Sequence, residues 1–329
     1  MTKIIKINPD NIDTDLIKEA AAVIKRGGLV AFPTETVYGL GADTFNENAV
    51  KEIFAAKGRP MDNPLISHIA RFDEVERFAR EIPQSAVKLA EHFWGGPLTM
   101  IFKKRRGIPD SVTAGLDTVA VRLPSHSIAN ALIKYSGTPI AAPSANLSGK
   151  PSPTTARHTI QDLDGRVDMI IDGGEAFIGI ESTVIDLSTP VPTVLRPGAI
   201  SPEDMKSIIG DVYYGKNTAD APKCPGMKYK HYSPDAEVFV MNNIENADDV
   251  CTKDACVIVK NAKNYSFKNC KCVFDAGSDD HQYAARLFYL LRRADEDGLK
   301  YVYAQMPGDD GIGVALKNRL LKAAAGRVL

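Results

Sequence analysis

The sequence lacks the features of a membrane-spanning, secreted or disulfide-bonded protein. No apolar run approaches the ~20 residues that a transmembrane helix needs. The first residues, MTKIIKINPD, contain no apolar segment of the kind found in signal peptides. The five cysteines, all in the last third of the chain, are odd in number and form no CxxC pair, which argues against a disulfide framework and a zinc knuckle. We therefore expect a cytoplasmic protein without membrane contact.

An excess of charge of either sign is also missing. The chain has 40 basic and 41 acidic residues, so its net charge is −1 and no global field draws it to nucleic acid or to a membrane surface. Hydrophobic residues make up 44% and charged residues 25%, which is typical of an ordinary globular protein. A length of 329 residues is long for one domain and sufficient for two.

Several catalytic signatures are absent as well. No GxxxxGK[ST] loop is present, so a nucleotide would have to be bound without a Walker-type phosphate loop. No HExxH or GxSxG motif and no cluster with metal-ligand spacing occurs either. We therefore predict no protein-bound metal and no serine-based catalytic triad.

What is present is an alternation of helix and strand patterns over the first 200 residues. Apolar residues recur at helical spacing in 15–28 and 47–59, and short buried strands are predicted at 29–34, 98–104 and 118–124. Several strands follow one another without an intervening helix, so the sheet should be large and partly antiparallel. We predict a mixed-sheet α/β domain over residues 1–205.

In the rest of the chain the hydrophobic periodicity is lost and then returns. Residues 211–234 lose all periodicity, and we predict a linker over residues 206–234. Strand patterns then return, followed by a strong amphipathic helix pattern at 281–298. We predict a second, smaller α/β domain with parallel-sheet character over residues 235–329.

Polar side chains gather where predicted strands run into turns rich in Gly, Pro and Ser, which is where a rigid sheet usually presents binding groups. Guanidinium, ammonium and hydroxyl groups at such positions suit a triphosphate and a small zwitterion. The candidates are Thr34, Thr36, Lys57, Arg59, Asn63, His68, Arg122, Ser144, Asn146, Ser182, Thr183 and Arg196.

Each candidate also has an ordinary structural explanation. Hydroxyl groups of Ser and Thr near proline often cap turns. Lys57 and Arg59 could complement the dipole at the end of a helix. His68, in an apolar run, could be a core histidine with its hydrogen bonds satisfied. The grouping of so many candidates, rather than any one of them, favours a binding site.

The ordered motifs resemble a known family. FPTETVYGLGAD, KGRPMDNPLISH, GPLTMIF, VRLP, APSANLSGKPSPT, ESTVID and LRPGAI resemble the YrdC-like domain of threonylcarbamoyl-adenylate synthases. PGMKYKHYSP, followed by a small domain ending in GVALKNRL, is similar to the long, two-domain form. The resemblance covers nearly the whole chain. The chain departs from the usual motifs at Gly95, where the family usually has proline, and at Cys224, where it usually has serine.

The resemblance implies a fold, a reaction and partners. The fold is a twisted mixed-sheet YrdC-like domain, a linker and a small Rossmann-like α/β domain. L-threonine, bicarbonate or CO2, and ATP with its Mg²⁺ would give threonylcarbamoyl-AMP and pyrophosphate. Downstream transfer proteins would then move the threonylcarbamoyl group to the adenosine beside the anticodon of tRNAs that read ANN codons. Direct contact with tRNA stays open.

The resemblance also implies roles for individual residues. Lys57 and Arg59 are the predicted catalytic residues, because cations stabilise the charge that grows on the leaving pyrophosphate. L-threonine would bind through Thr36, His68, Arg122, Ala142 and Ser182. ATP would bind through Arg59, Asn63, Thr118, Ser144, Asn146, Ser152, Arg196, His231 and Tyr232.

The linker has two interpretations. Lys228, Lys230, His231 and Tyr232 resemble a lid that closes over the nucleotide, and a brace between the two domains is the alternative.

Three other functions are alternatives, and one of them, a structural role for the C-terminal domain alone, is left open by the sequence. The resemblance also implies a basic concave face on the first domain. A tRNA- or double-stranded-RNA-binding module without turnover would use this face, although it would not need the amino-acid pocket of Thr36, His68 and Arg122. A carbamoyl-phosphate-dependent carbamoyltransferase would need zinc-finger and acylphosphatase segments, for which this chain has neither CxxC pairs nor spare length.

Overall fold

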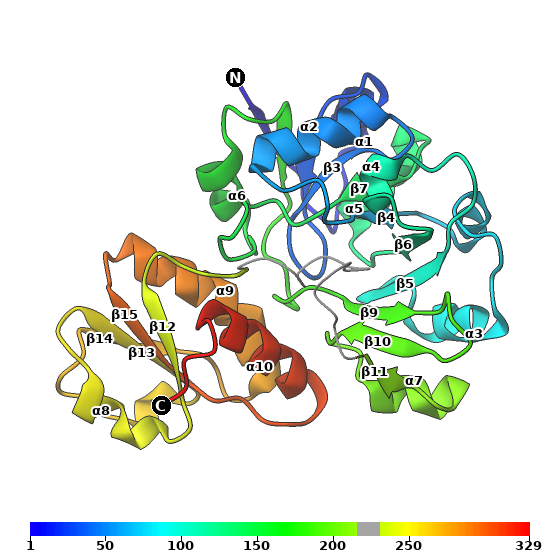
Figure 1. The fold of residues 1–329 in the computed structure, drawn as a ribbon. Coiled ribbons are helices and arrows are strands. Elements are labelled where there is room, and N and C mark those ends of the chain that lie inside the picture. Colours follow the sequence, from blue (N-terminus) through cyan, green and yellow to red (C-terminus); the bar gives the residue numbers. More distant parts are fainter. Residues whose placement is uncertain (216–230) are drawn as a thin grey trace.

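The computed structural model describes residues 1–215, the first unit, and residues 231–329, the second unit. The strands form two sheets, one of eleven strands in the first unit and one of four in the second. Figure 1 shows the first unit in blue to green and the second in yellow to red. Among the described residues, no helix is long and apolar enough to cross a membrane.

The sheet of the first unit is mixed, which confirms the predicted fold class. Its strands, from one edge to the other, are β1 (Lys3–Lys6), β8 (Met169–Asp172), β2 (Val30–Phe32), β3 (Gly39–Asp43), β7 (Ile140–Ala142), β4 (Ile66–His68), β6 (Thr118–Arg122), β5 (Leu98–Lys103), β9 (Thr183–Asp186), β10 (Thr193–Arg196) and β11 (Tyr213–Tyr214). β4 pairs parallel with β6 and antiparallel with β7, and β5 pairs antiparallel with β6 and parallel with β9. These central strands carry the functional site.

Helices of the first unit bury apolar stripes against this sheet. α1, for example, is capped by the carboxylate of Asp13 and buries Ile17, Val23 and Ile24 in a core with Phe32. The helices are α1 (Thr14–Lys25), α2 (Glu47–Lys57), the 3₁₀ helix η1 (Phe72–Arg77), α3 (Gln84–Phe93), α4 (Asp110–Thr113), α5 (Ser127–Ser136), α6 (Ala156–Leu163) and α7 (Pro202–Ile209).

The end of α2 brings two cations to the site. The side chain of Asn46 caps its N-terminus, and Gly58, with φ of +60°, ends it in the left-handed conformation that glycine adopts without a Cβ clash. Lys57 and Arg59 flank this glycine, and only 2% and 9% of their surfaces are exposed. The motif KGR is therefore a helix end that turns into the site.

The second unit is a small all-parallel sheet with helices on it, as predicted. The strand order is β12 (Glu237–Met241), β15 (Tyr301–Gln305), β13 (Ala255–Val259) and β14 (Cys272–Asp275). The other elements are η2 (Ile244–Asn246), α8 (Ala247–Val250), η3 (Ala262–Asn264), α9 (Asp280–Glu296) and α10 (Gly311–Ala323). α9 and α10 lie between this sheet and the first unit (Figure 1).

The region predicted as the start of the linker is structured. α7 runs through the predicted boundary at residue 205, and β11 then pairs parallel with β10. The first sheet therefore extends to residue 214, because two tyrosines add a short edge strand where the sequence shows no periodicity.

Gly179 allows the two units to approach closely. Its φ is +78°, and a Cβ placed there would lie 2.4 Å from Cα of Ala285 and 2.5 Å from the carbonyl oxygen of Ala284, both in α9. The backbone of this segment is bonded to the site, since the amide of Gly179 donates to the carbonyl of Thr36 at 3.1 Å. A methyl group here would separate α9 from the segment that supports Thr36.

We predict that Gly179→Ala lowers the free energy of unfolding by ~1–3 kcal/mol more than Gly115→Ala, the scale of overpacking a close contact. Gly115 is the matched control because its φ is +77° and nothing lies within 4 Å of a Cβ placed there. Both variants carry the same left-handed strain, and only one meets α9. Urea unfolding of the two variants measures the difference; equal losses would contradict the close approach.

Candidate functional site

The predicted site residues meet at a cavity between the central strands of the first unit and the start of the second unit. It encloses about 630 Å³ of empty space, counting its open mouth. Its lining is Thr34, Thr36, Val37, Tyr38, Gly39, Arg59, Ile66, His68, Arg122, Ala142, Pro143, Ser144, Asn146, Lys150, Ser152, Glu181, Ser182, Arg196, His231 and Tyr232.

Arg122 is the central cation at one end of the cavity. It ends β6, where register places it beside His68 of β4 and Thr99 of β5. Its guanidinium donates to the hydroxyl of Thr36 at 2.9 Å and forms an ion pair with Glu35 at 2.7 Å. Burial alone would raise the pKa of Glu35, but the charge of Arg122 and a hydrogen bond from it outweigh burial and lower that pKa. The pair is therefore ionised at neutral pH.

His68 is a neutral imidazole beside this arginine. Burial, followed by the positive charge of Arg122, lowers the pKa of His68 to about 3. Its Nδ1 lies 3.1 Å from the carbonyl oxygen of Ile66, so Nδ1 carries the proton and donates to that oxygen. The Nε2 lone pair is then left to accept a hydrogen bond.

Ser182 connects this end of the cavity to Arg196. Its hydroxyl lies 2.8 Å from that of Thr99 and accepts a hydrogen bond from Arg196 at 3.1 Å. Arg196, at the end of β10, also donates to the carbonyl of Ser182 at 3.1 Å. The strand ends of β9 and β10 thus place a hydroxyl and a cation side by side.

A loop of hydroxyl and amide groups, residues 144–152, forms another wall. The hydroxyl of Ser144 donates to Oδ1 of Asn146 at 2.5 Å. The amide of Asn146 donates to the carbonyls of Leu147 at 2.7 Å and Lys150 at 2.9 Å. The side chain of Asn146 therefore stabilises the conformation of the loop through these hydrogen bonds.

Lys57 supports this loop from outside the cavity. Its ammonium donates to the carbonyl oxygens of Ser144, at 2.5 Å, and of Asn146. Burial, followed by the charge of Arg59, lowers the pKa of Lys57 well below its usual range. The amine therefore faces fixed carbonyls rather than the cavity.

Glu181 is a buried carboxylate in the wall. It accepts a hydrogen bond from the hydroxyl of Ser152 at 2.5 Å and one from Nε of Arg319, in α10, at 3.0 Å. Burial would raise the pKa of Glu181, but the charges of Arg319 and then Arg196 lower it. The second unit thus contributes to the site through an arginine behind the wall.

His231 and Tyr232 begin the second unit and close one side. Burial, followed by the charge of Arg59, lowers the pKa of His231 to about 4. In the part of the chain that the structure describes, Nε2 of His231 is buried without a hydrogen-bond partner. Tyr232 has φ of +63°, and its ring stacks on Phe288 of α9 with centroids 5.1 Å apart. The strained backbone of Tyr232 is held by packing on the second unit.

Most of the predicted residues meet here. Four do not line this cavity. Lys57 faces the loop carbonyls, and Asn63 is buried beside Arg59, whose guanidinium donates to its carbonyl at 3.3 Å. Thr118 begins β6, at the far end from Arg122, and the hydroxyl of Thr183 donates to the carbonyl of Ile200 at 2.8 Å. Lys228 and Lys230 lie outside the described residues. The cavity is lined by Thr36, Arg59, His68, Arg122, Ala142, Ser144, Asn146, Ser152, Ser182, Arg196, His231 and Tyr232.

Sequence reasoning missed several residues. Glu181 directly follows the apolar stretch at 178–180, and an acid in such a run signals a buried partner. Glu35 stands between two threonines, so its sequence neighbours give no such signal. Lys150 lies within a motif that was recognised, although the lysine itself was not singled out. Arg319 is 138 residues from Glu181, and no local pattern points to that pairing.

The arrangement suits an anion and an amino acid, and it has no built metal site in residues 1–215 and 231–329. No group of three or more His, Cys, Asp or Glu side chains there could hold a metal ion. The carboxylates at the cavity are paired with arginines. Cations and hydroxyls are what phosphate and carboxylate groups require.

Comparisons with known proteins show the family of the chain. The family described as telomere recombination, Sua5/YciO/YrdC, matches residues 22–198, and the threonylcarbamoyl-AMP synthase C-terminal domain matches residues 200–325. A threonylcarbamoyl-AMP synthase of Pyrococcus abyssi is 47% identical and covers 100% of this chain and 99% of its own. One of Bacillus subtilis is 43% identical, covering 95% and 94%.

A solved structure is similar over the whole length. The crystal structure of P. abyssi Sua5 complexed with L-threonine superposes with a TM-score of 0.93 at 45% identity, covering 100% of this chain and 99% of that one. Both sequence and structure are therefore shared from end to end. The chain belongs to the threonylcarbamoyl-AMP synthase family, in its long form with a C-terminal domain.

Proposed function

We propose that this chain makes threonylcarbamoyl-AMP from L-threonine, bicarbonate or CO2, and ATP, with release of pyrophosphate. This is the first step of N6-threonylcarbamoyladenosine formation in tRNAs that read ANN codons. The observation that carries the proposal is one cavity in which the Arg122, Thr36 and His68 group lies beside a second group of cations and hydroxyls. The names of the full-length relatives support the same reaction.

The first group suits L-threonine. Arg122 would bind the carboxylate, since a guanidinium fork matches it and Glu35 holds the fork in place. Ser182 and the neutral Nε2 of His68 would accept hydrogen bonds from the amine or the side-chain hydroxyl, and Ala142 would form the apolar floor. The related structure from P. abyssi is described as a complex with L-threonine.

The second group suits ATP. Arg59 and Arg196 would contact the phosphates, together with Ser144, Asn146 and Ser152. The Nε2 of His231, which is buried and has no hydrogen-bond partner among the described residues, supplies one more polar group on this side, next to Tyr232. Asn63 and Thr118 would contact the nucleotide only beyond the cavity. Mg²⁺ enters the proposal bound to ATP.

The reaction needs charge stabilisation rather than a covalent nucleophile. The amine of threonine takes up CO2, forming a C–N bond and losing a proton, to give a carbamate. A carbamate oxygen then attacks the α-phosphorus, and the bond from that phosphorus to the β-phosphate oxygen breaks. Negative charge grows on pyrophosphate as it leaves, so Arg59 keeps its catalytic role. Lys57 acts in this proposal by holding the carbonyls of the loop 144–152.

The later steps of the pathway extend the proposal beyond this chain. The mixed anhydride hydrolyses readily, and a closing segment would protect it from water. His231 and Tyr232 are the described residues of the predicted lid. Transfer proteins would receive the adenylate in the cytoplasm and deliver its threonylcarbamoyl group to tRNA.

We predict that pyrophosphate release from ATP by the full chain requires both L-threonine and bicarbonate, and that Arg59→Ala lowers the rate at least ~10-fold. The reason is the loss of a cation that faces developing charge. The exposed Arg106→Ala is the matched control and should keep the wild-type rate. Release independent of threonine, or RNA binding without release, would contradict the proposed reaction.

We predict that Arg122→Ala weakens L-threonine binding far more than ATP binding. Removing one partner of a buried carboxylate contact costs roughly 2–5 kcal/mol. Calorimetric titration with each ligand separately measures the two affinities. If both affinities fell by the same factor, Arg122 would not belong to the amino-acid subsite.

A further inference from the structure

Two arginines of the second unit lie buried at its boundary with the first. Arg292 of α9 is 6% exposed and Arg319 of α10 is 0% exposed. Burying a guanidinium costs free energy unless hydrogen bonds and an opposite charge replace its hydration. Both arginines find these partners in the first unit, and the partners belong to the wall that carries the loop 144–152.

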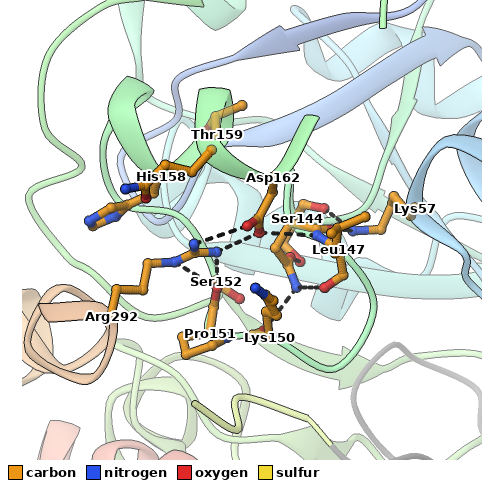
Figure 2. Close-up of polar contacts among 12 residues, drawn as sticks. Lys57, Ser144, Leu147, Lys150, Pro151, Ser152, His158, Thr159, Asp162 and Arg292 are labelled. Atoms are coloured by element: carbon orange, nitrogen blue, oxygen red, sulfur yellow. Dashed lines mark hydrogen bonds and ion pairs between the residues drawn. The ribbon is translucent and has the colours of Figure 1, made fainter. Parts of the chain in front are cut away.

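Arg292 forms hydrogen bonds with this loop near the C-terminal end of the loop. Its Nε and one terminal nitrogen donate to the carbonyl of Pro151 at 3.1 and 2.6 Å. Its two terminal nitrogens also donate to the two carboxylate oxygens of Asp162, in α6, at 3.2 and 2.7 Å. Figure 2 shows the guanidinium between these groups, with Ser152 next to Pro151. One side chain therefore fixes the peptide that precedes a lining hydroxyl.

Asp162 connects Arg292 to the middle of the loop through a further hydrogen bond. Its Oδ2 accepts a hydrogen bond from the amide of Leu147 at 3.1 Å, and its side chain is 3% exposed. Leu147 follows Asn146, whose side chain bonds to Ser144. The dashed contacts in Figure 2 run from Arg292 through Asp162 to the part of the loop that Lys57 holds.

Arg319 acts on the same loop from a second direction. It orients Glu181 through Nε, at 3.0 Å, and it donates to the carbonyl of Pro197 at 2.6 Å. Glu181 in turn accepts from the hydroxyl of Ser152. The backbone just beyond Ser152 is also held, because the amide of Tyr38 donates to the carbonyl of Pro153 at 2.9 Å. Ser152 thus has a fixed backbone on both sides and a fixed side chain.

We infer that the second unit is a positioning element for the nucleotide subsite, and that Arg292 and Arg319 are positioning residues that hold the loop 144–152 in its ligand-binding shape. This inference rests on the proposed function for the identity of the ligand as ATP. A simple brace between domains would need only the ion pair of Arg292 with Asp162. The additional bonds to Pro151 and, through Glu181, to Ser152 act on the residues that line the cavity.

The inference separates the two substrates. Arg122 and His68 are held by Glu35, Gly96 and Ile66, all in the first unit and apart from the loop. Loss of Arg292 should therefore weaken ATP binding roughly 10–100-fold, by analogy with the loss seen when a supporting contact behind a metal ligand is removed. Threonine binding should stay within about twofold of the wild type, since its contacts do not pass through the loop.

The test compares Arg292→Ala with Arg293→Ala in the full chain. Arg293 is the adjacent residue of α9 and is exposed, and its partners among the described residues, Asp297 and Tyr289, lie in the second unit. Calorimetry with ATP and with L-threonine, together with a thermal melt, is run on both variants. We expect a selective loss of ATP affinity in Arg292→Ala and wild-type affinities in Arg293→Ala.

A second variant covers the case in which Arg292→Ala fails to fold. Arg292→Lys keeps a cation near Asp162 and Pro151, but an ammonium group cannot reproduce the hydrogen bonds that the guanidinium makes to both partners. Its ATP affinity should therefore lie between those of the wild type and Arg292→Ala. Hydrogen exchange in the peptide containing Leu147 should rise in Arg292→Lys and not in Arg293→Ala.

Two results would overturn the inference while leaving the proposed function intact. One is an ATP affinity in Arg292→Ala and Arg292→Lys equal to that of Arg293→Ala. The other is an equal loss for ATP and threonine, which would mean a brace without selectivity. A wild-type chain that binds threonine but no ATP would instead overturn the proposed function, and this inference with it.

Discussion

A guanidinium or ammonium group removed from water is stable only if fixed oxygens or an anion replace its hydration. This chain buries several such groups around one cavity. Arg122 is neutralised by Glu35 and Arg319 by Glu181, while Lys57 rests on backbone carbonyls. Arg122 lines the cavity and is paired with an anion, while Arg319 and Lys57 lie behind the wall and hold the carboxylate and the backbone that form it.

The same requirement joins the two units. Among residues 1–215 and 231–329, the buried carboxylate partners of Arg319 and Arg292 lie across the boundary, in Glu181 and Asp162. Removing one partner of either pair while the two units stay in contact would leave a buried charge without its partner, which is strongly destabilising. Gly179 completes the contact by letting the backbone of α9 approach the segment behind Thr36. Architecture and site are consequently parts of one electrostatic arrangement.

Much of this arrangement follows from local patterns in the sequence. The alternation of helix and strand patterns predicts the mixed sheet and the small parallel sheet, because their apolar faces repeat with the period of each element. The motifs at strand ends predict most of the cavity lining, since turns on a rigid sheet present polar groups. Ser182 and Arg196, for example, lie where such turns place them.

The features that local sequence patterns do not predict depend on contacts between residues far apart in the chain. The partnership of Glu181 with Arg319 spans 138 residues, and that of Asp162 with Arg292 spans 130. No periodicity encodes such pairs. The direction of Lys57 is also invisible in the motif KGR, because the left-handed turn at Gly58 decides whether a flanking cation faces the cavity or the loop. The edge strand β11 was missed because two residues carry no period.

The central claim is that one cavity separates an amino-acid subsite at Arg122 from a nucleotide subsite at Arg59 and the loop 144–152. The most direct test is a crystal structure of the full chain with L-threonine and a non-hydrolysable ATP analogue. The account predicts the threonine carboxylate within hydrogen-bond distance of Arg122 and the phosphates beside Arg59 and Ser144. Phosphates bound at Arg122, or threonine bound away from it, would contradict the account.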